Sequence, residues 1–299
     1  MTSTLANARE DCDFQMSTTD LFDGATGHLQ TVTLDELNET AELQSRMDRK
    51  YIVDKSRLAD VIAANGTGLR VLEIDDHRGS HYTSTYFDTP DLVSYMSTAR
   101  SRPTRFKVRT RRYGDAPETW LEVKQRSVHG KTIKERIQLG SGAPATVLGL
   151  STFYDGQVGL KGAESIAFLN EFDTIAPHVV NLSRKLTTAY TRMTLLCSSL
   201  GQRIPQGQRV TIDCDLRCGL PDGSGIDIGR LGDLMIIETK SPGHGPGPFD
   251  RALWSMHIRP IVISKYALGM ASSDPTLPSN KWHRVLSRYV RPGCDKAER

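Results

Sequence analysis

The segment RFKVRTRR, residues 105–112, carries five cations in eight positions. Side chains alternate between the two faces of a β-strand. Apolar Phe106 and Val108 therefore fall on one face of the expected strand. The opposite face holds Arg105, Lys107, Arg109 and Arg111. A strand with one wholly cationic face raises the expectation of a sheet whose polar side meets an anion.

Four later segments alternate in the same way, at residues 119–126, 131–139, 208–215 and 234–240. Their polar faces hold Glu122, Lys124, Arg126, Lys134, Arg136, Arg209, Thr211, Asp213, Asp215, Glu238 and Lys240. Each strand alone is compatible with a half-buried antiparallel sheet that exposes a solvated face. Between residues 100 and 136, however, twelve Lys or Arg stand against four acids. Like charges on neighbouring strands repel, so this excess favours a compensating anion.

These faces predict an α+β fold built on a closed or nearly closed antiparallel barrel. The apolar faces would pack outward against helices, and the charged faces would line a lumen. Arg forks bind phosphate oxygens in bidentate fashion and Lys acts as a point charge, so a lumen of this kind suits a phosphate chain. Glu122, Asp213 and Glu238 would either pair with the cations or hold a divalent ion that bridges phosphates.

The rest of the chain divides by composition. Residues 1–40 predict a polar N-terminal arm, partly disordered, with a short helix near 34–43. Residues 41–272 form the tunnel domain, with a helical insertion at about 143–188. Residues 273–299 predict a basic C-terminal tail with a helix in KWHRVLSRYVR.

Composition excludes several classes of protein. A formal charge of +3 over 299 residues is not globally basic, and no reader motif for nucleic acid is present, so we expect no nucleic-acid partner. No apolar run approaches the roughly 18–20 residues that span a bilayer, and the N-terminus lacks the pattern of a signal peptide. Together with five cysteines, an odd number, these features predict a cytoplasmic location.

Nine fragments occur in a familiar order. They are MDRKYIVD, STYFDTPDLVSYM, RFKVRTRRYG, WLEVKQRS, GKTIKERI, AYTRMTLL, QRVTIDCDL, MIIETKSP and ISKYALGMA. From Arg46 to Met270 the chain thereby resembles the VTC domain, the catalytic domain of polyphosphate polymerases in the triphosphate tunnel metalloenzyme superfamily. The resemblance implies an antiparallel barrel around a basic tunnel.

The resemblance also implies roles for individual residues. Lys50 matches a phosphate-binding lysine, Arg109 and Arg111 match paired tunnel arginines, and Glu238 matches a metal-binding glutamate. Further basic or substrate-binding positions are Lys124, Lys134, Arg136, Tyr190, Arg192, Arg209, Lys240, Ser264 and Lys265. The chain departs from the pattern at Val262, where some members carry another basic residue.

The activity implied is transfer of the γ-phosphoryl group of ATP to a growing polyphosphate chain, with Mn²⁺ or Mg²⁺ as cofactor. Two alternatives stay open. Water could replace the phosphate acceptor, which would make the protein a tripolyphosphatase or nucleoside triphosphatase. The tunnel could also bind polyphosphate or an inositol phosphate without turnover. A membrane-protein partner is not visible in the sequence.

Overall fold

The computed structural model describes residues 17–41, 46–114, 116–126, 132–139, 162–197, 207–242 and 245–291. One sheet dominates it, with the path β2-β11-β9-β8-β4-β5-β6-β7, and every neighbouring pair on this path is antiparallel. The strands are β2 Arg46–Asp54, β4 Ser80–Asp88, β5 Arg105–Tyr113, β6 Thr119–Arg126, β7 Thr132–Leu139, β8 Ser183–Cys197, β9 Gln208–Gly219 and β11 Leu234–Pro242. Short strands at the periphery are β1 Gln30–Val32, β3 Leu69–Leu72 and β10 Gly225–Ile226.

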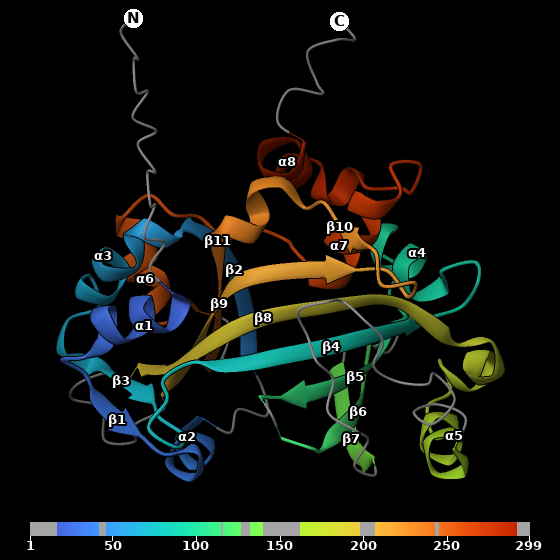
Figure 1. Cartoon of the computed structure of the whole chain (residues 1–299), viewed down its shortest axis with the longest axis horizontal. Coiled ribbons are helices and arrows are strands. Elements are labelled where there is room, and N and C mark those ends of the chain that lie inside the picture. Colours follow the sequence, from blue (N-terminus) through green and yellow to red (C-terminus); the bar gives the residue numbers. More distant parts are fainter. Residues whose placement is uncertain are drawn as a thin grey trace, which may run out of the picture.

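Helices surround this sheet (Figure 1). The α-helices are α1 Thr18–Thr26, α2 Leu34–Ala41, α3 Leu58–Ala63, α4 Val93–Ala99, α5 Ala163–Asn170, α6 Pro248–Ser255, α7 Lys265–Ser273 and α8 His283–Val285. Shorter helical turns are η1 Lys55–Arg57, η2 Gly66–Gly68, η3 Ala176–Asn181, η4 Gly229–Asp233, η5 Asn280–Trp282 and η6 Leu286–Val290. Within the described ranges, no helix is both long enough and apolar enough to span a bilayer. The predicted α+β class is confirmed.

The outer face of the sheet is apolar and covered. Over β2, β8, β9 and β11, Phe22 of α1, Leu58 at the start of α3 and Phe249 of α6 pack on residues such as Tyr51 and Val210. All five side chains are fully buried. Burial of a side chain of this size contributes roughly 1.5–3 kcal/mol. The apolar residues of this cluster therefore face away from the lumen, as predicted.

The same holds where the cationic segment lies. Phe106 and Val108 of β5 join a second apolar cluster with Leu121 of β6, and α5 and η3 cover it. Phe168 of α5 is buried in that cluster. The opposite face of β5 is consequently free to carry its cations inward.

Helix α7 approaches the charged side of the sheet. Its residues Tyr266 and Leu268 pack with Tyr86 of β4 and Leu186 of β8. Gly269 makes this approach possible, because a Cβ there would lie 2.7 Å from a methyl carbon of Leu186. The fit fixes the first residues of α7 close to the cations.

The barrel is open rather than closed. In the part of the chain that the structure describes, β2 and β7 are the two ends of the sheet and do not pair with one another. Next to β2, the Ile261 amide donates to the Lys50 carbonyl at 2.8 Å, so the segment before α7 covers part of that edge. The curled sheet keeps a charged inner face and one side without a strand.

Alternation fails at one predicted position. The register of β8 and β9 shifts between Ala189 and Thr191, and Asp215 adopts φ 55°. This bulge turns the Asp215 carboxylate to Lys55 and Thr18 instead of the lumen. A bulge changes which face the following residues occupy, and nothing in the alternation of the sequence announces it.

Some predicted boundaries also differ. The arm expected for residues 1–40 is folded from residue 17 onward, with Phe22 and Leu37 fully buried; residues 1–16 lie outside the described ranges. The helical insertion predicted to reach residue 188 ends earlier, because β8 begins at Ser183. Residues 143–161 are again outside the description. The expected C-terminal helix occupies Asn280–Val290 as three short turns.

Candidate functional site

The register of β5, β6 and β7 arranges the inner face in rows. We call Lys107, Lys124 and Lys134 the lysine row, because these residues lie directly opposite one another on successive strands. The next row is Arg109, Glu122 and Arg136, followed by Arg111, Trp120 and Gln138. Like charges placed directly opposite across strands destabilise a sheet. The lysine row therefore stands in the fold at a cost in stability.

Glu122 organises the second row. Arg109 donates to one carboxylate oxygen of Glu122 through Nε at 2.8 Å and Nη2 at 2.6 Å, and Tyr113 donates to the other at 3.2 Å. Lys134 Nζ lies 4.0 Å from Glu122, which is only 2% exposed. Burial would raise the pKa of Glu122, but Arg109 and Arg111 outweigh it and lower the pKa to about 2. Glu122 is thus charged at neutral pH and holds Arg109 in one orientation.

Arg111 is held from the neighbouring strands. Its Nε donates to Ser84 Oγ at 3.1 Å and its Nη2 to the Tyr190 hydroxyl at 3.4 Å. Its guanidinium also lies 5.5 Å from the ring centroid of Tyr82. At 7% exposure Arg111 is the more deeply placed of the two predicted arginines. Such contacts fix a guanidinium before a ligand arrives.

Asp213 of β9 collects two further cations. Arg192 of β8 forms a bidentate pair with it, with Nη2 2.8 Å from Oδ2, and Lys265 of α7 donates to the same oxygen. Burial would raise the pKa of Asp213, yet Arg192 and Lys265 lower it to about 2. Lys265 Nζ also sits 4.3 Å from the ring centroid of Tyr190. Helix α7 is thereby tied to the wall of the site.

Glu238 of β11 lies between two lysines. Lys50 Nζ of β2 is 2.8 Å from Glu238 and Lys240 Nζ is 3.6 Å from it. Although burial acts in the opposite direction, Lys50 and Lys240 hold the pKa of Glu238 well below its ordinary value. Arg209 lies directly opposite Lys240 in the β9–β11 register, which extends the basic wall.

The positive charges of the lysine row have fewer carboxylates near them than the cations around Glu122, Asp213 and Glu238. Lys124 and Lys134 remain 53% and 46% exposed, each 4.0 Å from one carboxylate, Asp48 and Glu122 respectively. Burial lowers the pKa of Lys134 to about 8. Lys107 donates to Ser264 Oγ at 2.9 Å, and burial together with Lys124 and Lys50 lowers its pKa to about 7. This row is where a polyanion gains most from binding.

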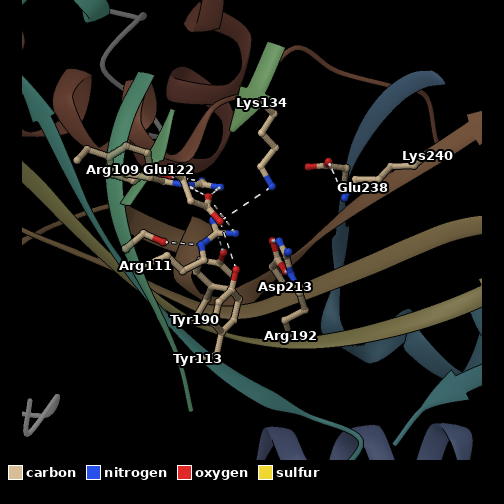
Figure 2. A network of polar contacts seen from close by, with 12 residues as sticks. Arg109, Arg111, Tyr113, Glu122, Lys134, Tyr190, Arg192, Asp213, Glu238 and Lys240 are labelled. Carbon is tan, nitrogen blue, oxygen red and sulfur yellow. Dashed lines mark hydrogen bonds and ion pairs between the residues drawn. The ribbon is translucent and has the colours of Figure 1, made fainter. Parts of the chain in front are cut away.

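Figure 2 shows how the clusters face one another. Arg109, Glu122 and Lys134 extend from β5, β6 and β7, and Asp213 and Glu238 extend from β9 and β11 toward them. The sheet carries both groups on its inner face. They bound one charged space.

A divalent ion would find one carboxylate there that is only partly enclosed. Glu238 is charged and 19% exposed at its side chain, so it can offer oxygen to a cation. Across the described residues, no three His, Cys, Asp or Glu side chains gather into a group able to hold a metal ion unaided. Mg²⁺ and Mn²⁺ accept oxygen ligands from a substrate as well as from protein. The residues present fit an ion that arrives with a phosphate ligand.

The positions predicted from the sequence come together around this space. Beyond those described above, Arg136 stacks on Trp120, with its guanidinium 4.3 Å from the ring centroid. Ser264 caps α7, and Val262 is 63% exposed. Sequence reasoning missed Tyr82 and Ser84 as partners of Arg111 and Tyr113 as a partner of Glu122. It also did not include Lys107 among the site residues. Alternation in HYTSTYFD places Tyr82 and Ser84 on one face, which could have indicated them.

Comparison with known proteins identifies a family. A family model described as VTC domain matches residues 45–273. Among solved structures, a putative adenylyl cyclase from Hippeastrum, described as having a dominant triphosphatase activity, is similar at 11% identity and TM-score 0.42, covering 76% of this chain and 96% of that one. The PH1819 protein from Pyrococcus horikoshii OT3 is similar at 10% identity and TM-score 0.33, covering 71% and 86%. None of the curated protein sequences gives a significant match.

Proposed function

The chain belongs to the VTC-domain family, and we propose that it is a phosphotransferase that moves the γ-phosphoryl group of ATP onto polyphosphate inside its basic channel. The family membership supports a substrate of the triphosphate or polyphosphate class. We further propose that ATP is the phosphoryl donor and that the product is a polymer. A divalent cation completes it.

One observation carries the proposal. Glu122, Asp213 and Glu238 share seven cations between them. Seven cations on three carboxylates leave an excess of four positive charges, before Lys107 and Lys124 are considered. An excess of charge of one sign repels itself, and a bound anion would relieve this repulsion. A chain of phosphates supplies repeated negative charge along the same direction as the rows.

Phosphoryl transfer requires mainly positioning and charge compensation from a protein. Arg109 and Arg111 are already oriented by Glu122, Ser84 and Tyr190, so they can meet phosphate oxygens without first losing side-chain freedom. We assign them, with Lys124 and Lys134, to the triphosphate. Lys50, Arg192, Arg209 and Lys265 would hold the donor or the growing chain.

The acceptor simplifies the chemistry. A terminal phosphate oxygen of polyphosphate is anionic near neutral pH, so it can attack without a protein base. Attack by this oxygen on the γ-phosphorus forms the new P–O–P bond as the bond to the β-phosphate oxygen breaks and ADP leaves. The cations around the space balance charge on both oxygens.

Glu238 would hold Mn²⁺ or Mg²⁺ jointly with phosphate oxygens. When bound, such an ion neutralises charge between transferring and leaving groups. Lys50 and Lys240, which pair with Glu238, would lie beside a phosphate held there. Glu238 therefore has a role in the empty protein and another in the loaded one.

The decisive test is product analysis. The purified chain is incubated with ATP and Mn²⁺ or Mg²⁺, and products are resolved on a gel. Long polymer is expected, and Glu238→Gln should lower its rate by roughly 100-fold or more. Exposed Asp233→Asn of η4 is the control, which should retain the wild-type rate. ADP and orthophosphate without polymer would contradict polymerisation.

That result would favour a second candidate, hydrolysis of a triphosphate. The open side between β2 and β7 supports it, because the half-exposed Lys124 and Lys134 show that solvent reaches the inner face. Water could then compete with the phosphate acceptor. Tight polyphosphate binding with neither product would instead indicate a binding module.

A further inference from the structure

Lys107 differs from the cations that pair with Glu122, Asp213 and Glu238. Each of the seven cations around Glu122, Asp213 and Glu238 has a carboxylate within 4.0 Å. Lys107 instead donates to the neutral hydroxyl of Ser264 at 2.9 Å. Its side chain is half-buried near the start of β5. A charged amine in such a place is costly unless an anion is near.

The groups that face Lys107 increase this cost. Lys124 lies directly opposite on β6, and the charges of Lys50 from β2 and of Arg105 and Arg109 on its own strand also act on it. All four are cations. Ser264, from the segment before α7, adds a hydroxyl without charge. A structural role alone would be served as well by an uncharged side chain that bonds Ser264.

We propose that Lys107 is a substrate-binding residue. As the polyanion enters, the Lys107 amine breaks its hydrogen bond with Ser264, contacts phosphate and takes up a proton. The inference rests on the proposed function, since it assumes that a condensed phosphate occupies the space. The step moves one proton from solvent to the amine Nζ, and no covalent bond to phosphorus changes. Ser264, released from Lys107, keeps its hydroxyl available to the same ligand.

The sign of the effect follows from the charges. Without a ligand, burial and the neighbouring cations set the pKa of Lys107 near 7, so about half of the molecules carry a neutral amine at pH 7. Phosphate oxygens beside Nζ favour the charged form and raise the pKa. Binding at pH 7 should therefore take up about half a proton at Lys107.

Two other lysines also start below their ordinary pKa. Burial lowers the pKa of Lys134 and Lys240 to about 8, against the carboxylates of Glu122 and Glu238. At pH 7 each is about nine-tenths charged, so each can take up only about a tenth of a proton. Among these three lysines Lys107 therefore dominates the uptake at pH 7, and the difference between wild type and a Lys107 variant cancels the protons that tripolyphosphate itself exchanges.

The experiment is titration calorimetry of the full chain with inorganic tripolyphosphate at pH 7, in buffers of different ionisation enthalpy. Wild type should take up about half a proton more than a variant without the Lys107 amine. Lys107→Met should bind roughly tenfold more weakly and lose most of the uptake. Lys107→Arg, charged at every accessible pH, should keep the affinity and also lose the uptake. Arg217→Met, an exposed change on β9, should behave as wild type.

The outcomes separate the two proposals. If wild type does not bind tripolyphosphate, the proposed function fails and this inference with it. If wild type binds, but Lys107→Met binds within twofold and takes up the same number of protons, only the inference fails. Thermal unfolding of each variant shows whether it is folded, and Lys107→Gln serves in place of Lys107→Met should the latter not fold.

Discussion

The two walls of the charged space differ in how many of their cations lie beside a carboxylate. On β8, β9 and β11, Arg192 and Lys265 meet Asp213, and Lys50 and Lys240 meet Glu238. On β5, β6 and β7, Glu122 compensates the arginines beside it, but Lys124 and Lys134 of the lysine row each lie 4.0 Å from a carboxylate. Each of these four cations pairs with a carboxylate on the first wall, although two positive charges remain in excess there. The second wall holds lysines with few carboxylates beside them, which a ligand can reach.

This difference between the walls has a thermodynamic explanation. Buried ions need partners, because removal from water costs several kcal/mol per ion. Half-exposed lysines keep part of their hydration and tolerate a missing partner. The first wall should therefore matter most for stability and the second for binding. Three predictions test this division.

The largest effect is expected from Asp213→Ala. The change leaves Arg192 and Lys265 without their carboxylate in a site where Asp213 is 1% exposed. Breaking a buried pair by removing one partner costs roughly 3–5 kcal/mol. Urea denaturation followed by circular dichroism measures it. Asp233→Asn, on the surface, should change the unfolding free energy by less than about 0.5 kcal/mol.

A double variant sharpens this result. Asp213→Asn combined with Arg192→Met removes both charges of the bidentate pair, so part of the lost stability should return. An equal or greater loss in the double variant would contradict the view that the unpaired cation is the cause.

For each carboxylate, a smaller effect is expected on acidification. Glu122 and Asp213 have folded-state pKa values of about 2, below the ordinary 4.5 and 3.8. Their stabilisation is therefore complete above about pH 5 and is lost as the pH falls toward 2, on the order of 2–3 kcal/mol each. Chemical denaturation between pH 7 and 3 measures this. A free energy that stays constant down to pH 3 would show that neither carboxylate is stabilised by its cations.

The smallest effect on stability is expected from Lys124→Met, in the lysine row. At 53% exposure and 4.0 Å from Asp48, Lys124 should change the unfolding free energy by within about 0.5 kcal/mol. Tripolyphosphate affinity should nevertheless fall roughly tenfold. Calorimetry and urea denaturation on one preparation compare the two quantities. A variant that loses stability but keeps its affinity would reverse the assignment of the two walls.

Sequence alternation predicted the inner face well, because a period of two is a local property of each strand. Arg109, Lys134, Glu238 and their neighbours lie on the face that the pattern indicated. It could not predict Asp215, since a bulge depends on how β8 and β9 are paired. Alternation also cannot show that the sheet remains open, because closure depends on the positions of β2 and β7.

The hydrogen-bond and ion-pair partner of a residue was harder to predict than the face of the sheet on which it lies. Nothing local distinguishes Lys107, which meets a hydroxyl, from Lys50, which meets a carboxylate; the difference arises from α7 and β11, far away in the chain. The short helix expected near residues 34–43 is present as α2, but the fold of residues 17–32 was missed for a similar reason. Phe22 belongs to a short segment with few apolar residues and no clear periodicity, and only the tertiary structure supplies the pocket in which it is buried.

The position of β7 at the edge of the sheet gives its charged residues a second role, in opposing aggregation. Within the described ranges β7 pairs with β6 alone, so its other edge presents a row of main-chain donors and acceptors. Exposed edges of this kind invite strand addition from another molecule, and charged side chains discourage it. Lys134, Glu135 and Arg136 are all exposed there. Neutralising them to study ligand binding would also remove a safeguard against aggregation, and light scattering should accompany every such variant.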